Sequence, residues 1–119
     1  MDAFAHAVSE SLRGMALAYP ETSEGTSCVN RAFKVRKKNF LFVGEKADQI
    51  KVMLKLGDSL EEARDLGDPR VGVGSTGWVT LRFSATDPLP EATLAAWVQE
   101  SFCTLAPKTV VKAWRAAQE

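Results

Sequence analysis

The sequence predicts an α+β fold, in which an antiparallel β-sheet has helices packed on one face. Near both ends of the chain, apolar residues recur every three or four positions, which is typical of amphipathic helices. In residues 29–56 and 78–84 they alternate with polar residues instead, which indicates half-buried strands. The connections between these strands are too short for the crossovers of a parallel sheet, so we expect the strands to be antiparallel.

The chain opens with a predicted helix over residues 2–19. Its apolar side chains fall on one face, and Pro20 ends it because a residue that precedes proline avoids helical backbone angles. The segment PETSEGTS, residues 20–27, is polar and rich in turn-forming residues. It is therefore predicted to be a loop.

Three strands are predicted next. RAFKVRKK and NFLFVGE form a hairpin whose turn lies around Lys37 and Lys38. The third strand, QIKVMLKL, shows the clearest alternation, and Gly57 closes it. A short helix follows in DSLEEARDL, with Asp58 or Ser59 as its cap. The remaining predicted elements are a strand at WVTLRFS, a helix over residues 91–105 and a last helical piece after Pro107.

Length and composition favour one compact domain over residues 1–119. The longest apolar stretches are far shorter than the roughly 20 residues that span a bilayer. The opening MDAFAHAVSESLRG lacks the basic and apolar regions of a signal peptide. These observations predict a cytoplasmic protein with no membrane partner.

Few residues carry the chemistry of catalysis or metal binding. The chain has two separated cysteines, Cys28 and Cys103, and one histidine, His6, which are too few for a zinc site. Reduced thiols are the expected state of both cysteines, and nothing in the spacing favours a catalytic Cys–His pair. The only adjacent carboxylates are Glu61 and Glu62, in a predicted exposed helix. We therefore expect no metal, no cofactor and no enzymatic activity.

The segment GVGSTG, residues 72–77, matches the glycine pattern of dinucleotide-binding loops. Such a loop must lead into a helix whose N-terminus binds the pyrophosphate, but here the predicted strand WVTLRF follows. The segment therefore indicates a glycine-rich turn that leads into a strand. A ligand loop at Gly74, Ser75 and Thr76, where a ligand approaches the backbone, is the alternative.

The charge of the chain is unevenly distributed. The net charge is zero, yet Arg31–Lys55 contains eight basic and two acidic residues. Alternation places several of these bases on the sheet face opposite the helices, with no acidic residue among them. The residues assigned to that face are Lys34, Arg36, Lys51, Met53, Lys55, Trp78, Thr80 and Arg82.

Such a face suits a polyanion, because Lys and Arg bind phosphates and an aromatic ring stacks on a base. The candidate DNA-binding residues are Lys34, Arg36, Lys37, Lys38, Lys51, Lys55, Trp78 and Arg82. The alternative is an ordinary solvated sheet face, on which Lys and Arg prevent edge pairing. A second basic group, Lys108, Lys112 and Arg115, is expected to complement the C-terminal end of the last helix.

Four segments carry a family resemblance. They are CVNRAFKVRKKNFLFV, IKVMLKL, WVTLRF and WVQESFCTLAPKTVVKAW, and ALAYPETSEGTS is similar to the family's opening Leu-Pro-Gly-x-x-Glu segment. Together they resemble the MmcQ/YjbR family of small bacterial proteins over nearly the whole chain. The resemblance implies a CyaY-like fold and DNA binding through the open sheet face, by analogy with a double-wing motif.

The matching positions are Phe33, Val35, Arg36, Trp78, Arg82, Pro107 and Lys108. Many members have a His-Trp pair before the late strand, whereas here Gly77 precedes Trp78, so any role of that histidine is absent. A frataxin-like iron role lacks its acidic ridge, because the first helix has only Asp2 and Glu10. The predicted function is a non-enzymatic DNA-binding protein. The alternative is a small-molecule or protein interaction module with a pocket near Gly72–Trp78.

Overall fold

The computed structural model describes residues 3–28, 30–47 and 49–119. Within these residues the chain forms six strands and four helices. In chain order they are α1 (Ala3–Leu17), β1 (Thr22–Ser27), β2 (Asn30–Val35), β3 (Lys38–Lys46), β4 (Gln49–Lys55), α2 (Leu60–Asp65), β5 (Val71–Val73), β6 (Trp78–Ser84), α3 (Glu91–Leu105) and α4 (Lys108–Gln118).

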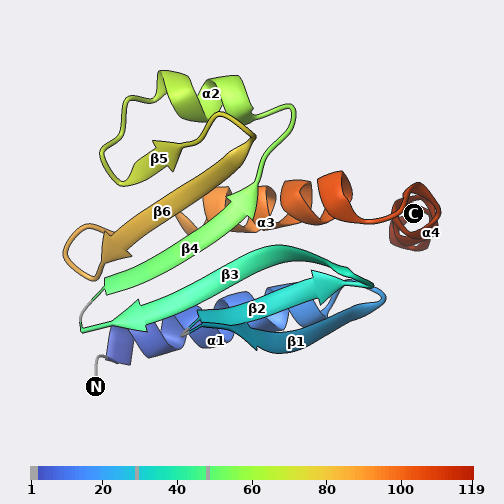
Figure 1. Ribbon diagram of the computed structural model, residues 1–119, viewed down its shortest axis with the longest axis horizontal. Helices are drawn as coiled ribbons and strands as arrows, with labels where there is room; N and C mark the ends of the chain where they lie inside the picture. The colour runs from blue at the N-terminus through green and yellow to red at the C-terminus, as the bar shows by residue number, and fades with distance from the viewer. Residues whose placement is uncertain (1–2, 29, 48) are drawn as a thin grey trace.

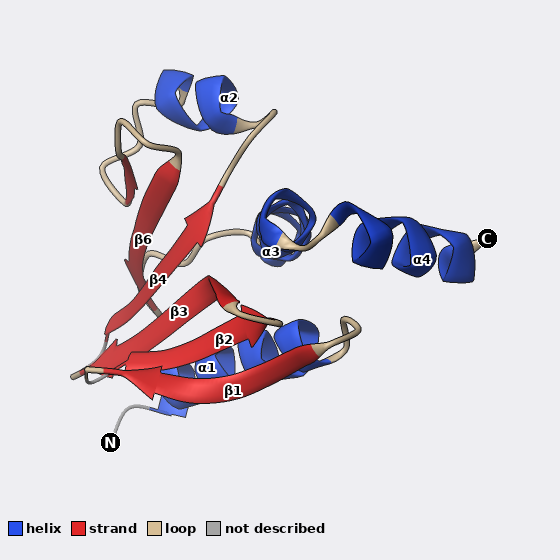
Figure 2. Cartoon of the chain, turned by 45° about the vertical axis from the view of Figure 1, so that its right-hand side comes forward, coloured by secondary structure: helices blue, strands red, loops and turns tan. Residues whose placement is uncertain are grey.

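The strands form one antiparallel sheet in the order β1-β2-β3-β4-β6-β5. Helices α1 and α3 pack on the same face of this sheet and lie behind the strands in Figure 1. Helix α2 packs beside β5, and α4 extends beyond the end of α3, as Figure 2 shows. The predicted α+β class, with helices on one face of an antiparallel sheet, is confirmed. No helix in the described part of the chain is long and apolar enough to cross a membrane.

Strand alternation builds the core between the sheet and the helices. Val52 and Leu54 of β4 and Leu81 of β6 point toward the helices and are fully buried. They meet Leu12 of α1 and Phe102 of α3, which are buried equally well. Burial of this apolar surface holds the two helices against one sheet face and leaves the other face uncovered.

The prediction of a loop over residues 20–27 is wrong, because Thr22–Ser27 is the edge strand β1. The polar composition that suggested a loop suits an edge strand, which has a partner on one side only. Glu24 of β1 faces α1, where it forms ion pairs with Arg13 and Arg31. At this position of β1, ion pairs therefore replace the apolar side chain on which the prediction of a strand from alternation depends.

A β-bulge in the β2–β3 hairpin redirects the chain. The predicted hairpin is confirmed, with its turn at Arg36 and Lys37, but the register shifts between Phe33 and Lys34. The shift leaves Phe40 and Leu41, which are adjacent in β3, both fully buried. Arg36 has a φ of +53° in the turn and is not part of either strand. The assignment of Arg36 to the sheet face is therefore wrong.

Strands β3 and β4 separate beyond the Leu41–Leu54 pair, and α3 fills the gap. The buried Ser101 hydroxyl donates a hydrogen bond to the Phe40 carbonyl, at 2.6 Å, and accepts one from the Lys55 N–H, at 2.9 Å. One side chain thus satisfies two backbone groups that have lost their ladder partners.

The short helix α2 is present, but its predicted side-chain cap is wrong. Ser59 occupies the N-cap position without making a side-chain capping bond. Its hydroxyl donates to Glu100 of α3 at 2.6 Å, and Glu100 also accepts the backbone N–H groups of Ser59 and Gly57. The carboxylate therefore fastens the β4–α2 connection to α3.

Candidate nucleic-acid interface

The sheet face turned away from α1 and α3 carries the residues that alternate with the core. We call it the open face. One row of this face crosses all six strands in register. The row consists of Gly25, Ala32, Phe42, Met53, Thr80 and Gly72. The largest side chains of the row, Phe42 and Met53, lie on the central strands β3 and β4. Glycine or alanine occupies the row on β1, β2 and β5, so the surface protrudes at its centre.

Four cationic side chains surround this apolar centre. They are Lys34, Lys51, Lys55 and Arg82. None of them forms an ion pair with any residue that the structure describes. The register also places no acidic residue at an open-face position within the described strands. The structure therefore brings together these four predicted residues and leaves their charge uncompensated.

Lys51 and Arg82 face each other directly across the β4–β6 ladder. Like charges directly opposite each other destabilise a sheet, because their Cβ atoms lie only about 5 Å apart. Among the residues that the structure describes, no acidic side chain is paired with either of them. An anion bound between the two side chains would relieve it.

Lys46 is a fifth cation at the margin of the open face. It pairs in register with Gln49 at the end of β3, and alternation points it to the same side as Phe42. Lys46 is not among the predicted residues, because it stands at the end of a strand, where the phase of the alternation is hard to assign. Lys37 and Lys38 lie at the opposite end of β3, both exposed, in or beside the hairpin turn.

Phe42 and Trp78 form the aromatic part of the face. Their strands, β3 and β6, are separated by β4, yet their ring centroids lie 5.8 Å apart with planes inclined by 54°. The two rings therefore lean toward each other above β4, and both remain half-buried. Phe42 was missed because NFLFV reads as one continuous apolar run, in which periodicity assigns no face.

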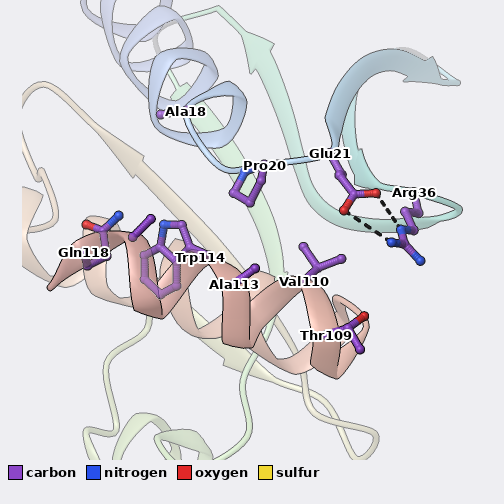
Figure 3. Close-up of a pocket in the computed structure, with 10 residues that line it drawn as sticks. Ala18, Pro20, Glu21, Arg36, Thr109, Val110, Ala113, Trp114 and Gln118 are labelled. Atoms are coloured by element: carbon purple, nitrogen blue, oxygen red, sulfur yellow. Dashed lines mark hydrogen bonds and ion pairs between the residues drawn. The ribbon is translucent and has the colours of Figure 1, made fainter.

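Arg36 lies apart from this group. Its guanidinium donates to both carboxylate oxygens of Glu21, at 2.7 and 3.3 Å. These hydrogen bonds lower the pKa of the Glu21 carboxyl and raise that of Arg36. The pair lies at one end of a shallow groove of about 490 Å³ beside α4, where Val110 and Trp114 form the apolar wall in Figure 3. Arg36 thus has an acidic partner already and does not belong to the open face.

The glycine-rich segment forms the turn that places Trp78. Gly74, Ser75 and Thr76 are exposed, and the Gly74 N–H donates to the Trp78 carbonyl at 2.9 Å. Gly77 has a φ of +95°, and a Cβ there would lie 3.1 Å from the Leu56 carbonyl oxygen. Gly77 is therefore explained by backbone geometry, since glycine tolerates both the angle and the close approach.

Acidic residues at the β5 edge are already engaged. Arg70 pairs with Asp68 at 2.6 Å and with Asp87 at 3.0 Å. Hydrogen bonds from the Arg70 side chain and backbone lower the pKa of Asp68 to about 2. These two carboxylates therefore contribute little negative potential to the neighbouring open face.

The described residues contain no group of three or more His, Cys, Asp or Glu side chains arranged to hold a metal ion. Cys28 and Cys103 are both free thiols, the first exposed and the second half-buried. His6 lies 3.7 Å from Glu45, on the side of the sheet that α1 covers.

The protein is thus an α+β protein whose antiparallel sheet has one face covered by helices and one uncovered, basic face. The chain belongs to the YjbR family, whose model matches residues 17–104. The match runs from the end of α1 through the sheet to the last turn of α3, and so includes the entire open face. A comparison with curated proteins gives no match.

Proposed function

We propose that this protein is a non-enzymatic DNA-binding protein that uses its open face. The observation that carries the proposal is the set of four cations, Lys34, Lys51, Lys55 and Arg82, with no ion-pair partner among the described residues. Interspersed charges of both signs are the arrangement that avoids a strong single-sign field on a surface. The open face carries a single sign, although the whole chain has as many acidic as basic residues.

The Lys51–Arg82 pair supports the proposal further. Two cations in direct register cost stability in the free protein, and phosphate neutralises both of them. Each Lys or Arg that contacts a phosphate also releases condensed counterions, which makes binding favourable and salt-dependent. In this proposal Lys37, Lys38 and Lys46 extend the phosphate path to both ends of β3.

The test is fluorescence anisotropy with a labelled mixed-sequence DNA at two salt concentrations. We expect binding that weakens steeply with salt. The double variant Lys51→Gln/Arg82→Gln is expected to bind less tightly, and its log–log salt slope is expected to be smaller by about 2, roughly one unit for each lost phosphate contact. The matched control is Lys108→Gln/Lys112→Gln on α4, which removes the same charge away from the open face.

Two results would count against the proposal. One is the absence of DNA binding at low salt, and the other is an equal loss of binding in the two double variants. A saturable ligand with little salt dependence, lost on substitution of Gly74, would favour an interaction module at the Gly72–Trp78 turn instead.

A further inference from the structure

We infer that the open face prefers single-stranded DNA to duplex DNA, because its aromatic pair is placed to stack on unpaired bases. This inference rests on the proposed DNA binding and names the form of DNA that the same face accepts. It follows from three features of the face, namely the position of the rings, the width of the sheet and the distribution of the cations.

The first feature is the position of the rings. Phe42 and Trp78 meet above β4, which has three strands on one side and two on the other. Both rings are half-exposed, and Figure 1 shows no helix on their side of the sheet. Ala32 of β2 lies beside Phe42 in its row, and the exposed Gly74 that follows β5 lies beside Trp78, so a flat base has access to a ring. Base–aromatic stacking tolerates any sequence because every base has a π-face.

The second feature is the width of the sheet. Six strands spaced by about 4.8 Å span about 24 Å, whereas the major groove of B-DNA is about 12 Å wide and admits only a helix or a two-stranded ribbon. Rings at the middle of this sheet therefore do not reach base edges in that groove. Wedging them into a minor groove requires the unstacking of base steps, which costs free energy. Unpaired bases are free of that cost.

The third feature is the distribution of the cations around the rings. Lys51 and Lys55 stand two residues before and after Met53 on β4, so each lies about 7 Å along the strand from the row that contains Phe42. Arg82 stands beside Lys51, and Trp78 stands beside Lys55. A strand that stacks a base on the ring pair therefore has cations available to its phosphates on both sides of that base.

The test compares four labelled probes of equal length with the intact protein: a thymidine oligonucleotide, a mixed-sequence single strand, its duplex, and an abasic strand. The abasic strand keeps the phosphates and lacks the bases. We expect both single strands to bind more tightly than the abasic strand, by a factor of about ten or more. We expect the duplex to bind more weakly than its own single strand at the same salt concentration.

Variants of Trp78 test whether the preference for strands that carry bases depends on the aromatic ring. Trp78→Leu is expected to lose most of the preference for bases, whereas Trp78→Phe keeps a ring and is expected to retain it. The control is Phe4→Leu, which removes a half-buried ring from α1, on the covered side of the sheet. Circular dichroism of each variant confirms that it is folded.

The outcomes separate this inference from the proposed function. Equal binding of single, abasic and duplex DNA, or tighter binding of the duplex, would overturn the stacking inference and leave open-face DNA binding standing. Retention of the base preference in Trp78→Leu would also overturn it. Failure of every probe to bind at low salt would overturn the proposed function and this inference together.

Discussion

The Ser101 hydroxyl lies 2.6 Å from the Phe40 carbonyl oxygen, at the point where β3 and β4 separate. It donates to that carbonyl and accepts from the Lys55 N–H. One side chain of α3 therefore bridges β3 and β4 where the hydrogen bonds between the two strands end. Lys55 and the neighbouring Trp78 of β6 belong to the open face. A buried residue on the covered side of the sheet thus supports the backbone of the candidate DNA-binding surface.

Replacement of this hydroxyl leaves two buried backbone groups without a partner. We expect Ser101→Ala to lower the free energy of unfolding by about 1–3 kcal/mol, which is the desolvation cost of an unsatisfied buried polar group. Chemical denaturation monitored by circular dichroism measures it. Ser11→Ala, on the exposed side of α1, is the control and is expected to stay within about 0.5 kcal/mol of the parent. Equal effects of the two substitutions would contradict the bridging role.

The like-charged Lys51–Arg82 pair predicts opposite effects on stability and on binding. Lys51→Gln removes a repulsion between directly opposed residues, so we expect the free energy of unfolding to rise by about 0.2–1 kcal/mol. In the proposed DNA complex the same change removes a phosphate contact, so it is expected to weaken DNA binding. Thermal unfolding and anisotropy on the same preparation measure both effects. A variant that is destabilised would show that the two charges do not repel in the folded protein.

Substitutions of two glycines by alanine are expected to change the free energy of unfolding in opposite directions. Gly77→Ala forces a side chain into a φ of +95° and 3.1 Å from the Leu56 carbonyl oxygen, so we expect a loss of about 1–3 kcal/mol. Gly14 lies in α1, and a Cβ there meets nothing within 4 Å. Gly14→Ala is therefore expected to stabilise the protein by about 0.5–1 kcal/mol, since alanine favours helix. A neutral Gly77→Ala would mean that the turn relaxes without cost.

Acid is expected to destabilise the fold through two carboxylates. Partial burial raises the pKa of Glu100, but hydrogen bonds from Ser59 and Gly57 lower it more, and the net pKa lies below its ordinary value of 4.5. Arg70 lowers the pKa of Asp68 to about 2. Both groups bind protons more weakly in the folded state, so their stabilisation is present above pH 4.5 and is lost as the pH falls toward 2.

Denaturation midpoints measured between pH 7 and pH 2 test this dependence. Glu100→Gln and Asp68→Asn are each expected to lower stability at neutral pH and to flatten the decline in acid. Glu62→Gln, on the exposed side of α2, serves as the control and is expected to leave the shape of the pH profile unchanged. An unaltered acid slope in Glu100→Gln would show that this carboxylate contributes nothing to it.

The sequence was sufficient for the sheet and the covering helices, because alternation at QIKVMLKL and WVTLRFS and the stripe over Glu91–Leu105 follow directly from burial on one side. It was insufficient at β1, where the Glu24 ion pairs take the place of an apolar pattern. It was also insufficient at the β-bulge, which buries both Phe40 and Leu41 and moves Phe42 to the open face. Both features depend on contacts with a neighbouring element, which the periodicity of one segment does not report.

The residues of the candidate site were likewise predicted where alternation assigns a face, and missed or misplaced where a contact between strands decides it. Lys34, Lys51, Lys55, Trp78 and Arg82 were placed on one face by alternation alone, and the structure brings them together there. Arg36 was misplaced because nothing local indicates that a turn begins at that residue, or that Glu21 lies within reach. The pairing of Phe42 with Trp78 needed the strand order, which periodicity does not supply.

The cations that face each other across β4 and β6 make the protein respond to salt in two opposing ways. Dissolved ions screen the repulsion between Lys51 and Arg82, so they reduce the destabilisation that this pair causes in the free protein. In the proposed DNA complex, the same ions would compete with the protein for phosphate and weaken binding. Rising ionic strength is therefore expected to reduce the stability that the proposed DNA complex gains by neutralising this pair, and a dilute medium is expected to increase it.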